Sequence, residues 1–61
     1  MYERFQAILD RKNLTAYNVA KNTGVSTVTL TAWKQGKYTP KIDKLIKIAE
    51  YLDCDVMELM K

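Results

Sequence analysis

The chain has 61 residues, of which 48% are hydrophobic, and its formal net charge at pH 7 is +3. This length indicates one domain, near the smallest size at which helix packing alone supports a fold. With one cysteine and no histidine, an intrachain disulfide and a zinc site of cysteine and histidine are both excluded. No apolar run is long enough to span a bilayer, and residues 1–6 lack the pattern of a signal peptide. We therefore expect a cytoplasmic protein without cofactor or metal.

Helical spacing predicts a first helix over residues 2–12. Its apolar residues recur on one side of the helix, and they are Tyr2, Phe5, Ile8 and Leu9. Asn13 is expected to end this helix, because asparagine tolerates the left-handed backbone conformation found after many helices.

A second helix is predicted to start after Thr15, whose hydroxyl can accept a hydrogen bond from a free backbone amide of the first turn. Val19 and Ala20 would face the core. Gly24 supplies the positive φ that a tight turn between helices requires, and Val25 can fill the hinge.

A third helix is predicted over residues 27–35, with Ser26 as its cap and Gly36 as its end. Leu30 and Trp33 lie one turn apart and face the core, so Trp33 is interpreted as a packing residue and not as one that stacks on bases. The opposite face is uncharged and consists of Val28, Thr31, Ala32 and Gln35. A helix face in contact with solvent would carry charge, so we expect this face to lie against a partner.

The basic residues gather around this uncharged face. Eight of the ten lysines and arginines lie between Arg11 and Lys47, where Asp43 is the one acidic residue, which gives this segment a net charge of +7 and the remainder −4. Lysines that only keep a small protein soluble are the simpler alternative. The segregation favours nucleic acid as the partner, with the third helix in the major groove of DNA.

A basic loop, residues 37–39, leads to a fourth helix predicted to begin at Pro40, a residue suited to the first helical turn. Apolar residues of this helix repeat at helical spacing: Ile42, Leu45, Ile46, Ala49 and Leu52. Its polar side carries Lys41, Lys44 and Lys47, of which the last two are interpreted as a solvated face. Asp55 is expected to cap a short fifth helix whose inner face includes Val56 and Leu59, with Met60 as a further candidate. No segment alternates with period two over the length of a strand.

At these positions the chain resembles the Cro and phage-repressor helix-turn-helix family, also described as the xenobiotic-response-element family of bacterial regulators. The resemblance covers nearly the whole chain. It rests on Leu14 and Thr15, Ala20, the Gly24-Val25-Ser26 hinge, Leu30 and Trp33, Gly36-Lys37, Pro40, residues 45–49 with Leu52, and the Val56 to Leu59 helix.

The resemblance implies an all-α, compact five-helix domain like that of the lambda repressor, with residues 1–61 as one domain and the helix-turn-helix at about 15–36. It also implies a regulator, a repressor in the first place, that binds double-stranded DNA. Two copies would read the half-sites of a palindromic operator about one helical turn apart. The chain ends where the DNA-binding domain of this family normally ends. It is therefore expected to be either a complete small regulator or the amino-terminal domain of a longer repressor.

Thr27, Val28 and Ala32 match positions that commonly contact base edges in this family, and Thr31 and Gln35 lie beside them. Thr15 and Ala16 match phosphate-contacting positions, and Lys37, Tyr38 and Thr39 match a loop that binds the backbone. From their places in the chain, Ser26, Lys34 and Lys41 are further candidates for backbone contacts. Tyr17 is equally well explained as a phosphate contact and as a half-exposed packing residue.

Two departures from the family pattern change the expected mode of reading. Many relatives have glutamine where this chain has Ala16, so backbone amides would replace a side-chain phosphate contact. Val28 and Ala32 occupy positions where relatives often have polar residues, and their expected partner is a thymine methyl group. After the fourth helix, at a position where relatives frequently have glycine, this chain has Asp53.

Three further assignments complete the sequence interpretation. Cys54 matches the position of a small core residue, so we expect it to be buried. Met57 and Met60 are candidate dimer contacts, the alternative being an exposed chain end. A helical protein-interaction module of the antitoxin or anti-regulator type is the alternative function, and the lack of histidine and of a glycine-rich phosphate loop argues against an enzyme. No membrane partner and no small-molecule ligand are expected.

Overall fold

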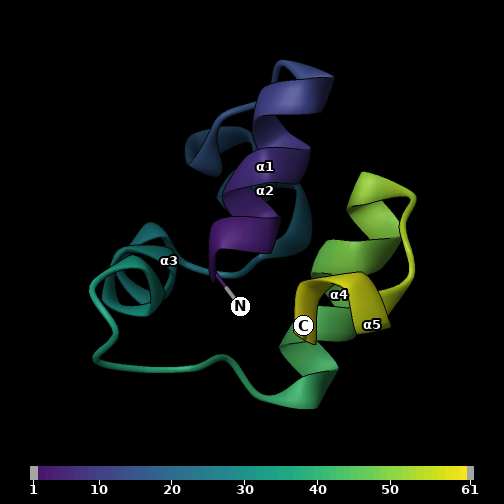
Figure 1. Cartoon of the computed structure of the whole chain (residues 1–61). Coiled ribbons are helices and arrows are strands. Elements are labelled where there is room, and N and C mark those ends of the chain that lie inside the picture. The colour runs from purple at the N-terminus through teal and green to yellow at the C-terminus, as the bar shows by residue number, and fades with distance from the viewer. Residues whose placement is uncertain (1, 61) are drawn as a thin grey trace.

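The computed structural model describes residues 2–60, and these form five helices and no strand (Figure 1). The helices are α1 (Tyr2–Lys12), α2 (Ala16–Thr23), α3 (Thr27–Lys34), α4 (Ile42–Leu52) and α5 (Val56–Met60). The predicted all-α fold with five helices is therefore confirmed. No helix in the described part of the chain is both long and apolar enough to cross a membrane.

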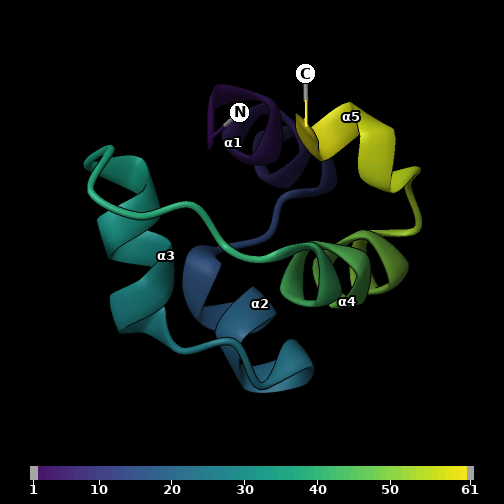
Figure 2. The same cartoon turned by 90° about the horizontal axis from the view of Figure 1, so that it is seen from below.

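The helices surround one apolar core (Figure 2). α3 lies at one side of the molecule and α4 with α5 at the other, while α1 and α2 occupy the space between them. α2 packs against α3 and α4, and α5 packs against α1 and α4. The buried side chains come from all five helices and the hinge: Phe5, Ile8, Leu9, Val19, Val25, Leu30, Trp33, Leu45, Ile48, Ala49, Leu52 and Leu59.

Local signals set the ends of the first three helices as the sequence predicts. Thr15 caps α2 by accepting a hydrogen bond from Asn18 N at 3.2 Å, and Asn18 Oδ1 accepts one from Thr15 N at 3.0 Å. Asn13 and Gly24 end α1 and α2 with φ of 60° and 80°. The chain can therefore turn sharply between α2 and α3 without a change in either helix.

Trp33 is a core residue, as predicted. Its side chain is 4% exposed, and its ring centroid lies 5.4 Å from that of Tyr2 and 5.1 Å from that of Phe5. The Tyr2 ring meets both neighbours edge to face, a favourable geometry for aromatic pairs. This aromatic cluster connects α3 to α1, in addition to the packing of α3 against α2.

The predictions for α4 are wrong in two respects. The helix begins at Ile42 with Lys41 as its N-cap residue, because Pro40 is buried ahead of the first turn and belongs to the extended connection. The inner face contains Ile48, which the sequence interpretation left out, while Ile42 is 51% exposed and Ile46 is 43% exposed. The apolar stripe of α4 is wider than the face that packs, so spacing alone did not identify its edge.

The carboxyl-terminal segment follows the predictions more closely. Asp55 caps α5, since its Oδ1 accepts a hydrogen bond from Met57 N at 3.0 Å. Leu59 is fully buried, whereas Met60 is 44% exposed and does not belong to the inner face. Cys54 is only half-buried, which corrects the expectation of full burial. Desolvation, with Glu58 nearby, raises the pKa of its thiol.

Candidate nucleic-acid interface

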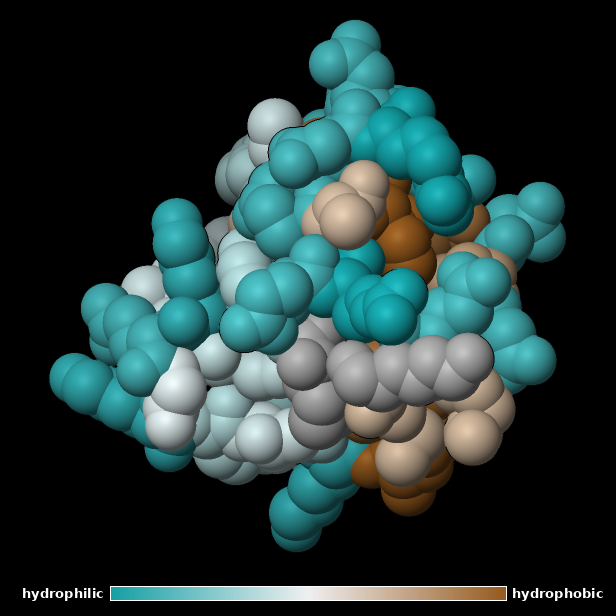
Figure 3. Space-filling model, in the orientation of Figure 1, coloured by the Kyte–Doolittle hydropathy of each residue, from teal (hydrophilic) through white to brown (hydrophobic). Residues whose placement is uncertain are grey.

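α3 presents the face that the sequence assigned to DNA, and the structure leaves it uncovered by the rest of the described chain. Val28 is 76% exposed, the largest exposed fraction among the large apolar side chains. Thr27, Thr31 and Gln35 are also exposed, whereas Ala32 is half-buried. Figure 3 shows surface of intermediate hydropathy and hydrophilic side chains on the part of α3 that is turned toward the viewer. None of the exposed or half-buried residues Thr27, Val28, Thr31, Ala32 and Gln35 is charged, and Lys34 borders this face.

The buried face of the same helix holds this surface in place. Leu30 is 2% exposed and Trp33 is 4% exposed, and Val25 fills the hinge in front of α3 at 3%. Ser26 Oγ caps the helix by accepting a hydrogen bond from Thr29 N at 3.1 Å. Residues of α3 that could read bases therefore sit on a helix whose position is set by its own core contacts.

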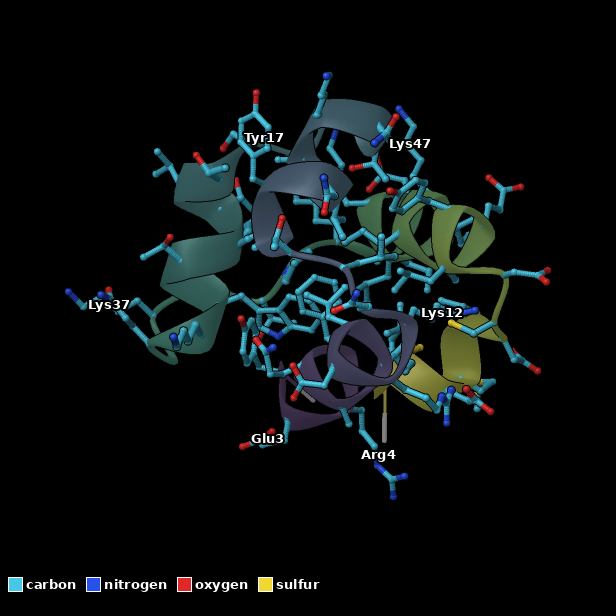
Figure 4. The ribbon with its side chains drawn as sticks, turned by 90° about the horizontal axis from the view of Figure 1, so that it is seen from above. Glu3, Arg4, Lys12, Tyr17, Lys37 and Lys47 are labelled. Carbon is cyan, nitrogen blue, oxygen red and sulfur yellow. The ribbon has the colours of Figure 1, made fainter. Side chains whose placement is uncertain are left out.

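The start of α2 lies beside α3, where a DNA strand bordering the groove would pass. Tyr17 is 65% exposed, and Figure 4 shows it pointing away from the molecule next to α3. Ala16 is half-buried and leaves this corner open. The Thr15 hydroxyl donates to Asn18 Oδ1 at 2.9 Å and also accepts the capping bond. Tyr17 is therefore the freest side chain at the start of α2 for a phosphate contact.

The Ser26 hydroxyl, like the Thr15 hydroxyl, both accepts and donates a hydrogen bond within the protein. It accepts the capping bond from the Thr29 amide and donates to Thr29 Oγ1 at 3.2 Å. Both predicted phosphate contacts would have to exchange a hydrogen bond within the protein for one to DNA. Their role as caps is shown by the structure, whereas their contact with phosphate stays a prediction.

Exposed basic side chains border α3 on its loop side. Lys34 lies in the last turn of α3, and Lys37 and Lys41 follow in the loop, all three exposed. Figure 4 shows Lys37 reaching into solvent at the far end of α3, while Lys12 and Lys47 lie on other sides of the molecule. Therefore only some of the basic residues between positions 11 and 47 lie beside the candidate interface.

The remaining loop candidates, Tyr38 and Thr39, are exposed beside Lys37. The Tyr38 side chain is 43% exposed. Together with Trp33, Lys34 and Gly36 they line a surface hollow of about 290 Å³, and its α1 side consists of Tyr2 and the acidic Glu3. The loop thus offers one phenol and one hydroxyl next to two ammonium groups, all groups that can donate hydrogen bonds to phosphate.

A second hollow, of about 200 Å³, lies between α1, the start of α2 and α3. Its lining consists of Tyr2, Gln6, Ala16, Thr27, Leu30, Thr31 and Lys34. The sequence interpretation assigned Ala16, Thr27, Thr31 and Lys34 to DNA and gave Tyr2 and Gln6 no such role. No local pattern marks Tyr2 or Gln6, because their position depends on how α1 packs against α3.

An apolar patch lies away from α3, on α4 and α5, which pack against each other. It consists of Ile42, Ile46, Met57 and Met60, whose exposed fractions lie between 43% and 56%. Figure 3 shows apolar surface gathered where α4 begins and α5 ends. The exposed apolar side chains thus include the candidate dimer contacts Met57 and Met60 and two isoleucines of the apolar stripe of α4, Ile42 and Ile46.

The comparisons with known proteins agree with this geometry. The family model described as Cro/C1-type HTH DNA-binding domain matches residues 4–61. No curated protein and no solved structure gives a significant match. Among the described residues, no group of three or more histidine, cysteine, aspartate or glutamate side chains could hold a metal ion.

Proposed function

Because the chain belongs to the Cro/C1-type helix-turn-helix DNA-binding family, we propose that it is a sequence-specific transcriptional repressor of phage or bacterial type. It acts in the cytoplasm as one DNA-binding domain and reads the major groove with α3. The observation that carries the proposal is the exposed face of α3, uncharged around a 76% exposed Val28 and bordered by exposed lysines.

The proposed contacts follow from what each side chain can do. Val28 and the half-buried Ala32 read thymine methyl groups by apolar contact, since neither can form a hydrogen bond. Thr27, Thr31 and Gln35 supply hydroxyl and amide groups for base edges. The sugar-phosphate backbone is held by candidates at the start of α2, in the hinge and in the loop: Thr15, Ala16, Tyr17, Ser26, Lys34, Lys37, Tyr38, Thr39 and Lys41.

We further propose that two copies bind a palindromic operator and associate through the apolar patch of Ile42, Ile46, Met57 and Met60. Exposed apolar side chains gathered on a small domain favour burial against another protein surface. Sedimentation equilibrium of wild type and of Ile46→Glu tests this, with Lys47→Glu as the matched control on the neighbouring, solvated position. A dimer that Ile46→Glu weakens and Lys47→Glu leaves intact supports the proposal; equal effects of both would contradict it.

Selection from random DNA tests the sequence-specific function. The purified protein should enrich an inverted repeat at moderate salt, and Val28→Lys should abolish or change the preference while the fold is retained. Lys37→Ala should weaken binding about equally on all sequences and reduce the salt slope by about one unit, because it removes one phosphate contact. Failure to enrich any motif would refute sequence-specific reading.

The protein-interaction module is kept as a second candidate because of the same apolar patch on α4 and α5. This function predicts weak DNA binding that hardly depends on salt and a tight complex with another protein. Salt-dependent binding of the selected duplex by wild type would decide in favour of the repressor.

A further inference from the structure

We propose that the hollow between Gln6, Ala16 and Lys34 is the seat of one backbone phosphate of bound DNA, so that α1 contacts the DNA through Gln6. The inference rests on the proposed function and adds a helix outside the helix-turn-helix to the interface. It concerns the hollow of about 200 Å³ whose walls come from α1, α2 and α3.

The position of the hollow makes a backbone contact there a consequence of the docking geometry. In a helix-turn-helix, the first helix crosses the sugar-phosphate backbone while the second lies in the major groove. The hollow is bounded by the first residue of α2 on one side and by Thr27, Thr31 and Lys34 of α3 on the other. A strand that passes the start of α2 along the edge of the groove must run over it.

Ala16, one of the seven lining residues, contributes only a small side chain to the wall of the hollow. A volume of about 200 Å³ exceeds that of several water molecules, whose share of liquid volume is about 30 Å³ each. The hollow is open to the surface, so a phosphate group can approach it from solvent. A larger residue in place of Ala16 would project into this space.

The chemistry of the walls suits an anion. Lys34 is exposed at the rim and brings a positive charge. Gln6 Nε2 donates to Asp10 Oδ1 at 2.9 Å, and because a side-chain amide has two N–H groups, a second donor remains for phosphate. The Tyr2 hydroxyl donates to Gln6 Oε1 at 3.0 Å, which fixes which end of the amide is the oxygen. The amide is thus oriented before DNA arrives.

The neighbouring hollow of about 290 Å³ has an acidic residue in its wall. It shares Tyr2 and Lys34 with the first hollow, but it is also lined by Glu3. A carboxylate in the wall repels phosphate. The lining of the first hollow contains no acidic residue, and Asp10, which accepts a hydrogen bond from Gln6, is not part of that lining. The first hollow is therefore the one assigned to the phosphate.

A double-mutant cycle between protein and DNA tests the assignment. The duplex recovered by selection is prepared with single methylphosphonate groups, each of which removes the charge of one phosphate, and binding is followed by fluorescence anisotropy. Gln6→Leu should weaken binding of the unmodified duplex by about threefold to tenfold. One methylphosphonate position should weaken binding by wild type and have little further effect on Gln6→Leu. Ala16→Leu, which fills the hollow, should lose the same phosphate contact.

Two controls separate a phosphate contact from a structural role of Gln6. Asp10→Ala removes the partner of the same amide but leaves Gln6 in place, so affinity should stay equal or increase. Circular dichroism verifies that each variant is folded. If Gln6→Leu and Ala16→Leu bind DNA as tightly as wild type while Lys37→Ala binds more weakly, the phosphate contact in the hollow is refuted. The proposed DNA binding would stand in that case. If wild type binds no duplex, the proposed function is refuted, and the proposed phosphate contact is refuted together with it.

Discussion

Val28 gives the most direct test of the proposed reading of bases by α3. Val28→Ala removes two methyl groups from a side chain that is 76% exposed, so the folded protein loses almost no packing. The thermal unfolding temperature should therefore stay within about 4 °C of wild type, as for an ordinary surface substitution in a small domain. Any change in DNA binding can then be assigned to the interface.

The magnitude follows from the burial of one methyl group. A thymine methyl packed against Val28 contributes about 0.8 kcal/mol, which is about fourfold in affinity. Replacement of that thymine by deoxyuridine removes this methyl and changes nothing else in the major groove. In fluorescence anisotropy titrations of the selected duplex, wild type should bind the deoxyuridine version about fourfold more weakly, whereas Val28→Ala should show no further loss on it.

Two results would contradict methyl reading by Val28. One is a wild-type affinity that no single thymine-to-deoxyuridine replacement changes. The other is a deoxyuridine effect that persists unchanged in Val28→Ala, because that methyl would then be read by another residue. Thr31→Val serves as the matched control, since it changes the neighbouring turn of α3 and should leave the deoxyuridine effect at Val28 in place.

The remaining predictions concern stability and reactivity. Trp33→Ala should lower the free energy of unfolding in urea by about 3–5 kcal/mol, most of what a domain of this size has; a loss below 1 kcal/mol would refute the core role of the aromatic cluster. Thr15→Ala should cost about 1 kcal/mol through the lost cap. Gly24→Ala should lower the free energy of unfolding by about 1–2 kcal/mol because of the φ of 80° at this position, although no atom beyond the two neighbouring residues lies within 4 Å of the added Cβ. Asp53→Gly, at a φ of 56°, should raise the unfolding temperature. The raised pKa of Cys54 means less thiolate at pH 8.5 in the folded protein than in urea, so iodoacetamide should alkylate the folded protein more slowly; equal rates would contradict this.

The ends of α1 and α2 were predictable because the residues that set them act locally. The Thr15 hydroxyl bonds to an amide three residues away, and Gly24 turns the chain by its own φ. Neither effect depends on the rest of the fold, so the sequence contains all the information required. The same reason explains why Leu30 and Trp33, one turn apart on a short helix, were assigned correctly to the core.

The errors concern properties that depend on how helices pack. Whether Ile46 or Ile48 faces the core depends on the side from which α2 and α5 approach α4, and both residues fit an apolar stripe. Pro40 is compatible with a first helical turn, but its burial in the connection moved the start of α4 to Ile42. The hollow beside Gln6 requires the contact between α1 and α3, and no spacing within α1 indicates it.

α3 separates the residues that keep it folded from those that meet its surroundings. Leu30 and Trp33 are almost fully buried, while Thr27, Val28 and Thr31 on the other side are exposed. Substitutions at these three exposed positions therefore change the surface offered to DNA at little cost in stability. A new operator preference can arise one residue at a time from an unchanged scaffold, so a library randomised at these positions should consist mostly of folded proteins. The domain is in this sense a template on which recognition can evolve, or be engineered, independently of the fold.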